Sequence, residues 1–83
     1  YVGINRDPKL KTEIHEHLLE IAEIDRIIEV TGRFDLMVGA LAEDLEQLHS
    51  IVVDKIGKID GIQNTETFVE LERTEKSPMY LSN

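Results

Sequence analysis

The chain of 83 residues contains no cysteine. Disulfide bonds, thiolate nucleophiles and cysteine-ligated metal sites are therefore excluded. The absence fits the reducing cytoplasm, which is the location we expect, and no signal-peptide pattern precedes the first apolar segment. No stretch approaches the roughly 18 consecutive apolar residues of a transmembrane helix, so we expect no membrane span.

Basic residues are few, with nine Lys and Arg against 17 Asp and Glu, for a net charge of -8. Proteins that bind nucleic acid through its phosphates need clustered cations to displace counterions, and here the cations are scattered. The same excess of negative charge disfavours anionic membrane surfaces. We therefore expect no direct nucleic-acid binding and no membrane binding by this segment.

The hydrophobic pattern predicts one small domain of six elements, since 41% of the residues are hydrophobic and no linker or repeat divides them. Their order is strand, helix, strand, strand, helix, strand. This order predicts an α+β fold, the ferredoxin-like βαββαβ plait, with a four-stranded antiparallel sheet and two helices on one face. The first and third strands should be central. The predicted strands are 1–5, 27–31, 34–42 and 62–71; the domain is 1–72, and 73–83 forms a polar tail.

Both predicted helices begin at recognisable start signals. Asp7 can cap free N–H groups ahead of Pro8, which the first helical turn tolerates. Asp44 with Gln47 resembles a capping box. An apolar stripe at helical spacing follows each signal. The stripes are Leu10, Ile14, Leu18, Ile21 and Ala22 in the first helix, and Leu45, Leu48, Val52 and Ile56 in the second.

The third predicted strand is apolar on both faces. Alternation predicts that one set of side chains points one way and a second set the other. Because the two helices cover only one face of the sheet, another surface has to cover the second. We expect the same sheet of another copy, which gives a twofold dimer. The first set is Phe34, Leu36, Val38 and Ala40, and the second is Met37 and Leu41.

Catalysis and metal binding find little support. The first strand–helix turn, residues 5–8, has one arginine, no glycine, and a carboxylate where a phosphate would sit. Hydrolysis of an acyl phosphate, known for some ferredoxin-like folds, is therefore a weak alternative. His15 and His17 lie two apart on a helix and cannot chelate one metal together. We predict no enzyme, no catalytic residue, no metal and no cofactor.

Two segments are less easily explained as scaffold. Gly32 suits a hairpin turn with positive φ, but Asp35 begins an apolar central strand, where burial does not favour a carboxylate. Thr65 and Thr67 present two hydroxyls on one side of the last strand. An α-amino acid needs a carboxylate for its ammonium and N–H or O–H donors for its own carboxylate. The alternatives are a solvent-facing strand end for Asp35 and plain β-propensity for the threonines.

Three segments also carry a family resemblance, which covers the chain from about Tyr1 to Leu71. They are Val30–Leu36 (VTGRFDL), Lys55–Ile62 (KIGKIDGI) and Thr65–Val69 (TETFV). At these spacings the sequence resembles the C-terminal domain of Lrp/AsnC transcription regulators, also called the RAM domain.

The resemblance implies dimers that form by sheet-to-sheet packing and often assemble further. It also implies a small effector, usually an amino acid, held between dimers near the hairpin turn. By this resemblance, residues of the turn form one wall of the effector site, and residues of the last strand contribute to it. The wall is Gly32, Arg33, Phe34 and Asp35, and the last strand supplies Thr65 and Thr67. Phe34 stands where tyrosine is also common in the family, so no phenolic hydroxyl is present there.

The expected function is thus that of the amino-acid effector-binding and oligomerisation domain of an Lrp/AsnC-type regulator. Many family members carry an N-terminal helix-turn-helix, and stand-alone versions of this domain also exist. Because the chain begins at Tyr1 without Met, we expect a segment of a full-length regulator. The alternative is a ligand-independent structural oligomerisation module, whose assembly size would ignore every amino acid.

Overall fold

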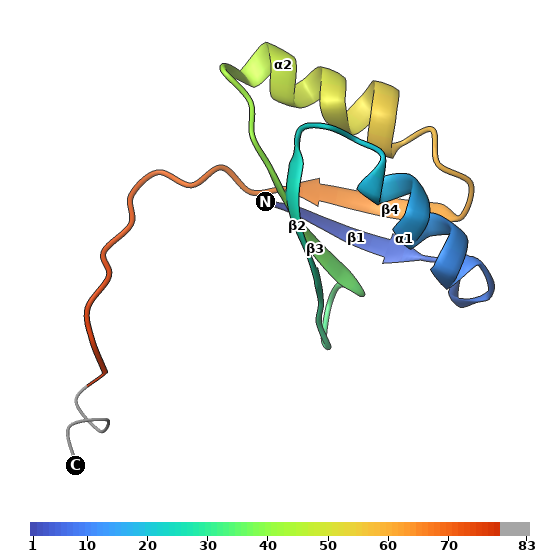
Figure 1. Ribbon diagram of the computed structural model, residues 1–83, viewed down its shortest axis with the longest axis horizontal. Coiled ribbons are helices and arrows are strands. Elements are labelled where there is room, and N and C mark those ends of the chain that lie inside the picture. Colours follow the sequence, from blue (N-terminus) through green and yellow to red (C-terminus); the bar gives the residue numbers. More distant parts are fainter. Residues whose placement is uncertain (79–83) are drawn as a thin grey trace.

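Strands and helices follow one another along the chain in the predicted order (Figure 1). The computed structural model describes residues 1–78, and residues 79–83 of the predicted tail lie outside the described residues. No helix within residues 1–78 is long and apolar enough to cross a membrane. The elements are β1 (Val2–Arg6), the 3-10 turn η1 (Pro8–Leu10), α1 (Lys11–Leu19), β2 (Ile24–Glu29), β3 (Leu36–Ala40), α2 (Leu45–Ser50), its π-helical continuation η2 (Ile51–Ile56), and β4 (Ile62–Thr67).

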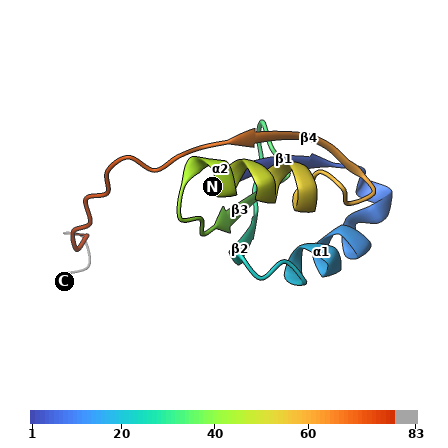
Figure 2. The same ribbon diagram turned by 90° about the horizontal axis from the view of Figure 1, so that it is seen from above.

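The four strands form one antiparallel sheet in the order β2-β3-β1-β4. The first and third strands are central, as predicted, and both helices lie on one face of the sheet (Figure 2). The chain after β4 leaves the sheet as an extended, exposed segment (Figures 1 and 2). The α+β, ferredoxin-like prediction is therefore confirmed.

The core lies between the sheet and the two helices. Alternation in β1 and β3 sends every second side chain toward the helices, where aliphatic side chains of both helices meet them. Burying one such side chain contributes about 1.5–3 kcal/mol. The fully or almost fully buried set is Val2, Ile4, Ile14, Leu18, Leu36, Val38, Ile51 and Ile56.

The predicted start signals act at both helices. The Asp7 carboxylate accepts a hydrogen bond from the Lys9 N–H at 2.9 Å. Asp44 accepts from the Gln47 N–H at 2.7 Å, and the Gln47 side-chain oxygen accepts from the Glu43 N–H at 2.6 Å. In a regular capping box the second bond would come from the N–H of Asp44 itself. The reciprocal arrangement is therefore present with a shift of one residue.

Several predicted boundaries are wrong by a few residues. Helix α1 ends at Leu19, where the predicted stripe ran to Ala22. Strand β2 begins at Ile24, three residues before the predicted start, and its pairing with β3 shifts between Ile24 and Arg26. This irregularity places Ile24 and Ile27 against the core at a spacing of three, which strand alternation does not anticipate.

Phe34 lies on the opposite face of the sheet from its predicted one. It precedes β3, so strand alternation does not govern its direction, and its ring packs over Gly3 on the helix-free face. It also meets Phe68 edge-on, with 6.0 Å between ring centroids. Leu36 and Val38 do point to the helices, as predicted.

Gly3 is a packing position and allows a direct test. A Cβ atom there would lie 2.8 Å from a carbon of the Phe34 ring. We expect Gly3→Ala to lower the free energy of unfolding by about 1–3 kcal/mol, as overpacking does. Urea unfolding measures this loss. In a Phe34→Ala background the same substitution should be milder, and an equal loss in both backgrounds would contradict the packing explanation.

Candidate functional site

The connection between β2 and β3 is longer than the predicted two-residue turn. It is closed by the Val30 N–H, which donates to the Asp35 carbonyl at 3.1 Å. Gly32 has φ +113°, and a Cβ atom there would meet nothing within 4 Å. The backbone conformation, and not lack of space, therefore requires glycine. We call residues 31–35 the effector loop, after the role that the sequence resemblance predicts for them.

Asp35 ties the effector loop to β1. Its N–H donates to the Ile4 carbonyl at 3.0 Å, and its Oδ2 accepts from the Arg6 N–H at 3.0 Å. Among residues 1–78, no group donates to its Oδ1. Asp35 is half-buried and is thus more than a solvent-facing strand end. One oxygen has a structural partner, and the other is available to a ligand.

Arg33 connects the effector loop to β4. Its guanidinium pairs with the Glu66 carboxylate at 3.1 Å and lies 5.5 Å from the centroid of the Phe34 ring. The Arg33 side chain is 78% exposed, so solvent screens this pair. The Asn5 amide donates to the Arg33 carbonyl at 2.9 Å and accepts from Asn64 at 3.3 Å. Side chains of β1 and β4 therefore hold the loop.

The effector loop carries unused hydrogen-bond donors. Within residues 1–78, the backbone N–H groups of residues 31–34 donate to no backbone or side-chain acceptor. Residues 31–33 are exposed. Backbone N–H groups grouped in a turn favour an anionic acceptor such as a carboxylate.

The two threonines do not join this group within one chain. Thr65 pairs with Ile4 and Thr67 with Val2, so both hydroxyls lie on the helix-covered side of the sheet. Glu66 between them pairs with Gly3 on the helix-free side. The structure thus brings together the four predicted turn residues but not Thr65 or Thr67.

Sequence reasoning missed three contributors, Asn5, Arg6 and Glu66. Alternation in the last strand places Glu66 on the opposite side from both threonines, and this signal could have identified it. The role of Asn5 depends on the fold, because it arises only when β1 lies beside the loop.

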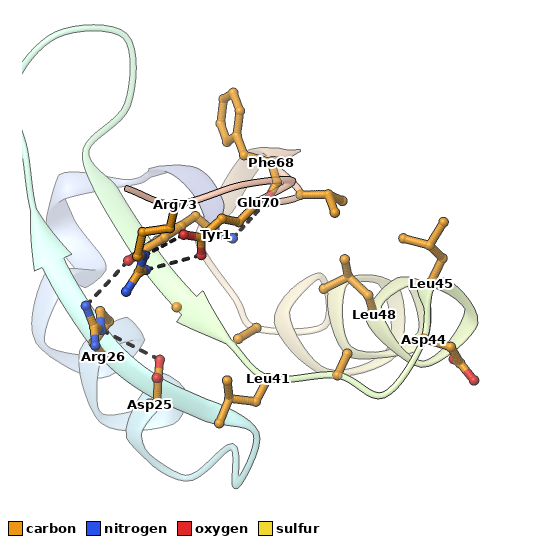
Figure 3. Close-up of a pocket in the computed structure, with 14 residues that line it drawn as sticks. Tyr1, Asp25, Arg26, Leu41, Asp44, Leu45, Leu48, Phe68, Glu70 and Arg73 are labelled. Atoms are coloured by element: carbon orange, nitrogen blue, oxygen red, sulfur yellow. Dashed lines mark hydrogen bonds and ion pairs between the residues drawn. The ribbon is translucent and has the colours of Figure 1, made fainter. Parts of the chain in front are cut away.

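Two hollows formed by residues 1–78 lie outside the effector loop. One of about 560 Å³ lies among the start of β1, the β3–α2 connection and the segment after β4 (Figure 3). In that view Leu45 and Leu48 lie on one side, and the ion-paired Arg73 and Glu70 on the other. None of the six predicted site residues lines it.

A cluster of charges lies at the base of the effector loop. Glu29 accepts from Arg6 at 3.0 Å and pairs with Lys11 at 3.2 Å. These cations, Lys11 first and Arg6 second, hold the pKa of the Glu29 carboxyl below its ordinary value. Together with neighbours on α1 they line a smaller hollow of about 220 Å³. Within residues 1–78, no three His, Asp or Glu side chains are grouped to hold a metal.

The sequence and the fold of this chain are similar to those of known proteins. Residues 1–80 match the family model for the Lrp/AsnC ligand binding domain. The chain belongs to this family. An uncharacterized HTH-type transcriptional regulator of Pyrococcus abyssi is 32% identical over 69 residues. These residues are 83% of this chain and 44% of the relative, so the chain spans less than half of that protein's length.

Solved structures share the fold. Escherichia coli AsnC superposes with a TM-score of 0.84 at 23% identity, over 94% of this chain and 53% of that one. A hypothetical protein from Pyrococcus horikoshii gives a TM-score of 0.73 at 29% identity, over 86% of this chain and 87% of that one. The fold thus occurs both as about half of a longer chain and as most of a short one.

The ion pairs of Glu29 predict a pH dependence of stability. Because its pKa is lowered in the folded state, the carboxylate stabilises the fold above the unfolded-state pKa, and this contribution disappears as pH falls through the lowered value. The difference in unfolding free energy between wild type and Glu29→Gln should therefore be largest near neutral pH and vanish in acid. Urea unfolding at a series of pH values measures it.

Glu72→Gln is the matched control for this titration. Glu72 is exposed and forms no ion pair with any group of residues 1–78. Its substitution should leave stability nearly unchanged at every pH. A Glu29→Gln effect that persists in acid would show that the loss has another origin.

Proposed function

We propose that this Lrp/AsnC domain binds an amino-acid effector and couples it to assembly of a transcription regulator. One observation carries the proposal. The effector loop presents the unused N–H groups of residues 31–34 beside the free Oδ1 of Asp35. Donors and a carboxylate are thus adjacent on one exposed turn, which suits a small zwitterion.

The charged groups of an amino acid match the hydrogen-bonding groups of the effector loop. The effector's carboxylate accepts from the loop N–H groups, and its ammonium donates to Asp35. The guanidinium of Arg33 lies at the same turn and can leave Glu66 for the ligand, because an exposed ion pair is weak. Such bonds to charged groups are stronger than neutral ones, so a small ligand can gain useful affinity here.

The site is completed by a second copy in this proposal. Residues 31–33 are exposed, and neither of the two hollows described above includes a residue of the effector loop, which supports a site that needs a second chain to enclose the ligand. Thr65 and Thr67 lie on the other side of their own sheet and can reach the effector only from another protomer. A ligand held between copies favours the assembly that encloses it.

The helix-free face of the sheet supports the proposed dimer. One row across the four strands runs from Ile28 through Met37 and Gly3 to Glu66. Phe34 and Phe68 extend the apolar part of this face. Two such faces stacked about a twofold axis would cover these side chains. In a full regulator, effector-dependent assembly would then move the attached DNA-binding modules.

Thermal unfolding against the twenty amino acids tests the effector. A ligand at a hundredfold excess over its dissociation constant stabilises the native state by about 2.7 kcal/mol. For a domain of this size we expect a rise in midpoint of about 10 °C or more for one or a few amino acids. Asp35→Asn should abolish this rise, because it removes the charge that binds the ammonium.

This variant is chosen because the asparagine side-chain oxygen can still accept from the Arg6 N–H. Its unfolding midpoint without ligand should therefore stay near that of the wild type. Glu70→Gln, on the segment after β4, is the matched charge control and should keep the full response. A flat panel for the wild type would favour a ligand-independent assembly module, and an undiminished response in Asp35→Asn would remove Asp35 from the site.

The proposed dimer is tested by Met37→Glu, which places a charge in the middle of the helix-free face. Burying an unpaired carboxylate is strongly unfavourable, so we expect the dimer to dissociate at micromolar concentration. Light scattering after size exclusion measures the mass. Leu19→Glu, on the exposed side of α1, should leave the mass unchanged. An intact Met37→Glu dimer would exclude this face as the interface.

A further inference from the structure

Arg6 touches both flanks of the effector loop. Its N–H donates to Asp35 Oδ2 at 3.0 Å, on the side where the loop enters β3. Its guanidinium donates to Glu29 Oε1 at 3.0 Å, on the side where β2 enters the loop. Although charged, the Arg6 side chain is only 12% exposed. A long side chain held this firmly has lost much of its freedom, which points to a definite position.

The topology explains why one residue can do this. Strands β1 and β2 both run antiparallel to β3, which lies between them, so their last residues lie at the edge where β3 begins. Arg6 pairs with Ile62 and Glu29 with Leu36, so both side chains lie on the helix-covered side. The guanidinium therefore passes beneath the start of β3 to reach Glu29.

We propose that Arg6 is a positioning residue for the effector loop, and that its ion pair with Glu29 sets the conformation, and through it the amino-acid affinity, of residues 31–35. This rests on the proposed function for its consequence on affinity, but not for its effect on the loop. Arg6 itself lies on the helix-covered side of the sheet and Arg33 on the other side, so Arg6 acts on the ligand through the loop.

The bond between the Arg6 N–H and Asp35 is made by the backbone and persists whatever side chain stands there. The guanidinium pair is what substitution removes. Arg6→Met keeps an unbranched apolar stem while it removes the charge. Lys11 is the matched control, because it pairs with the same Glu29 oxygen at 3.2 Å but comes from the exposed start of α1.

Two backbone amides at the ends of the loop report on whether Arg6 holds it in place. The Val30 N–H closes the loop, and the Asp35 N–H joins it to β1. The Leu41 N–H, bonded to the Glu23 carbonyl at 2.9 Å, lies at the far end of the β2–β3 pair and reports on general stability. Hydrogen exchange followed by NMR resolves such local openings.

In Arg6→Met, exchange at Val30 and Asp35 should accelerate roughly two- to fivefold, the range typical of an ion pair with a solvent-exposed partner such as Glu29, while Leu41 is unchanged. The dissociation constant of the amino acid that most stabilises the wild type should rise by a similar factor. Arg6→Lys, which keeps the charge, should bring both the exchange rates and the dissociation constant part of the way back to the wild-type values. Adding Glu29→Gln to Arg6→Met should change little further, because the pair is already broken. Lys11→Met should have the smaller effect.

Unchanged exchange at Val30 and Asp35, or equal acceleration at Leu41, would overturn the assignment of Arg6 as a positioning residue. Faster loop exchange with an unchanged dissociation constant would overturn its role in affinity. If the wild type binds no amino acid, the proposed function fails, and the exchange rates still decide whether Arg6 sets the loop.

Discussion

The pairing of β1 with β3 is the constraint on which the rest of the structure depends. Its register sets Val2 opposite Val38 and Ile4 opposite Leu36. These four side chains form the floor of the core, and both helices pack on them. A shift of one strand by one residue would turn its two side chains to the helix-free side and remove half of this surface from beneath the helices. The same pairing brings the end of β1 beside the start of β3, where the effector loop is tied down.

The interactions that hold the effector loop differ in kind from those that hold the core. The core is held by non-directional apolar burial, whereas the loop is held by hydrogen bonds from β1: the Ile4 carbonyl, the Arg6 N–H and the Asn5 amide. Directional bonds leave other donors and acceptors in fixed places, which burial alone does not. The unused N–H groups of the loop are thus oriented by the strand that anchors the core, so the proposed site inherits its order from the sheet.

Much of the fold could be predicted from the sequence, because apolar spacing and cap residues act locally. Asp7 and Asp44 mark the helix starts, and the element order specifies the central strands. The predictions are wrong where strand alternation no longer applies. The irregular pairing beside Asp25 broke the alternation of β2, and Phe34 lay just outside β3. Both depend on pairing between strands that are distant in sequence, which no single segment reveals.

The candidate site was less predictable for the same reason. Gly32 is predictable because a hairpin turn needs positive φ, and Asp35 because a carboxylate conflicts with an apolar strand; the structure gives each a specific local role. Arg6 and Asn5 did not stand out, because a polar residue at a strand end is ordinary until the loop is placed beside it. Zwitterion chemistry and the family resemblance both group Thr65 and Thr67 with the turn, and the register separates them from it within one chain.

Phe34 joins the two surfaces that the proposed function requires. Its backbone belongs to the effector loop, while its ring packs over Gly3 and against Phe68 on the helix-free face. A ligand that changes the loop backbone must therefore also move, or be resisted by, an aromatic ring in the face proposed to form the dimer. Two sites are coupled when the ligand of each site favours the same one of two arrangements of the protein. A rigid side chain that belongs to both sites, such as the Phe34 ring, can meet this requirement directly. If the sheets stack as proposed, effector binding and dimer packing are linked through this ring, and each must alter the free energy of the other by the same amount.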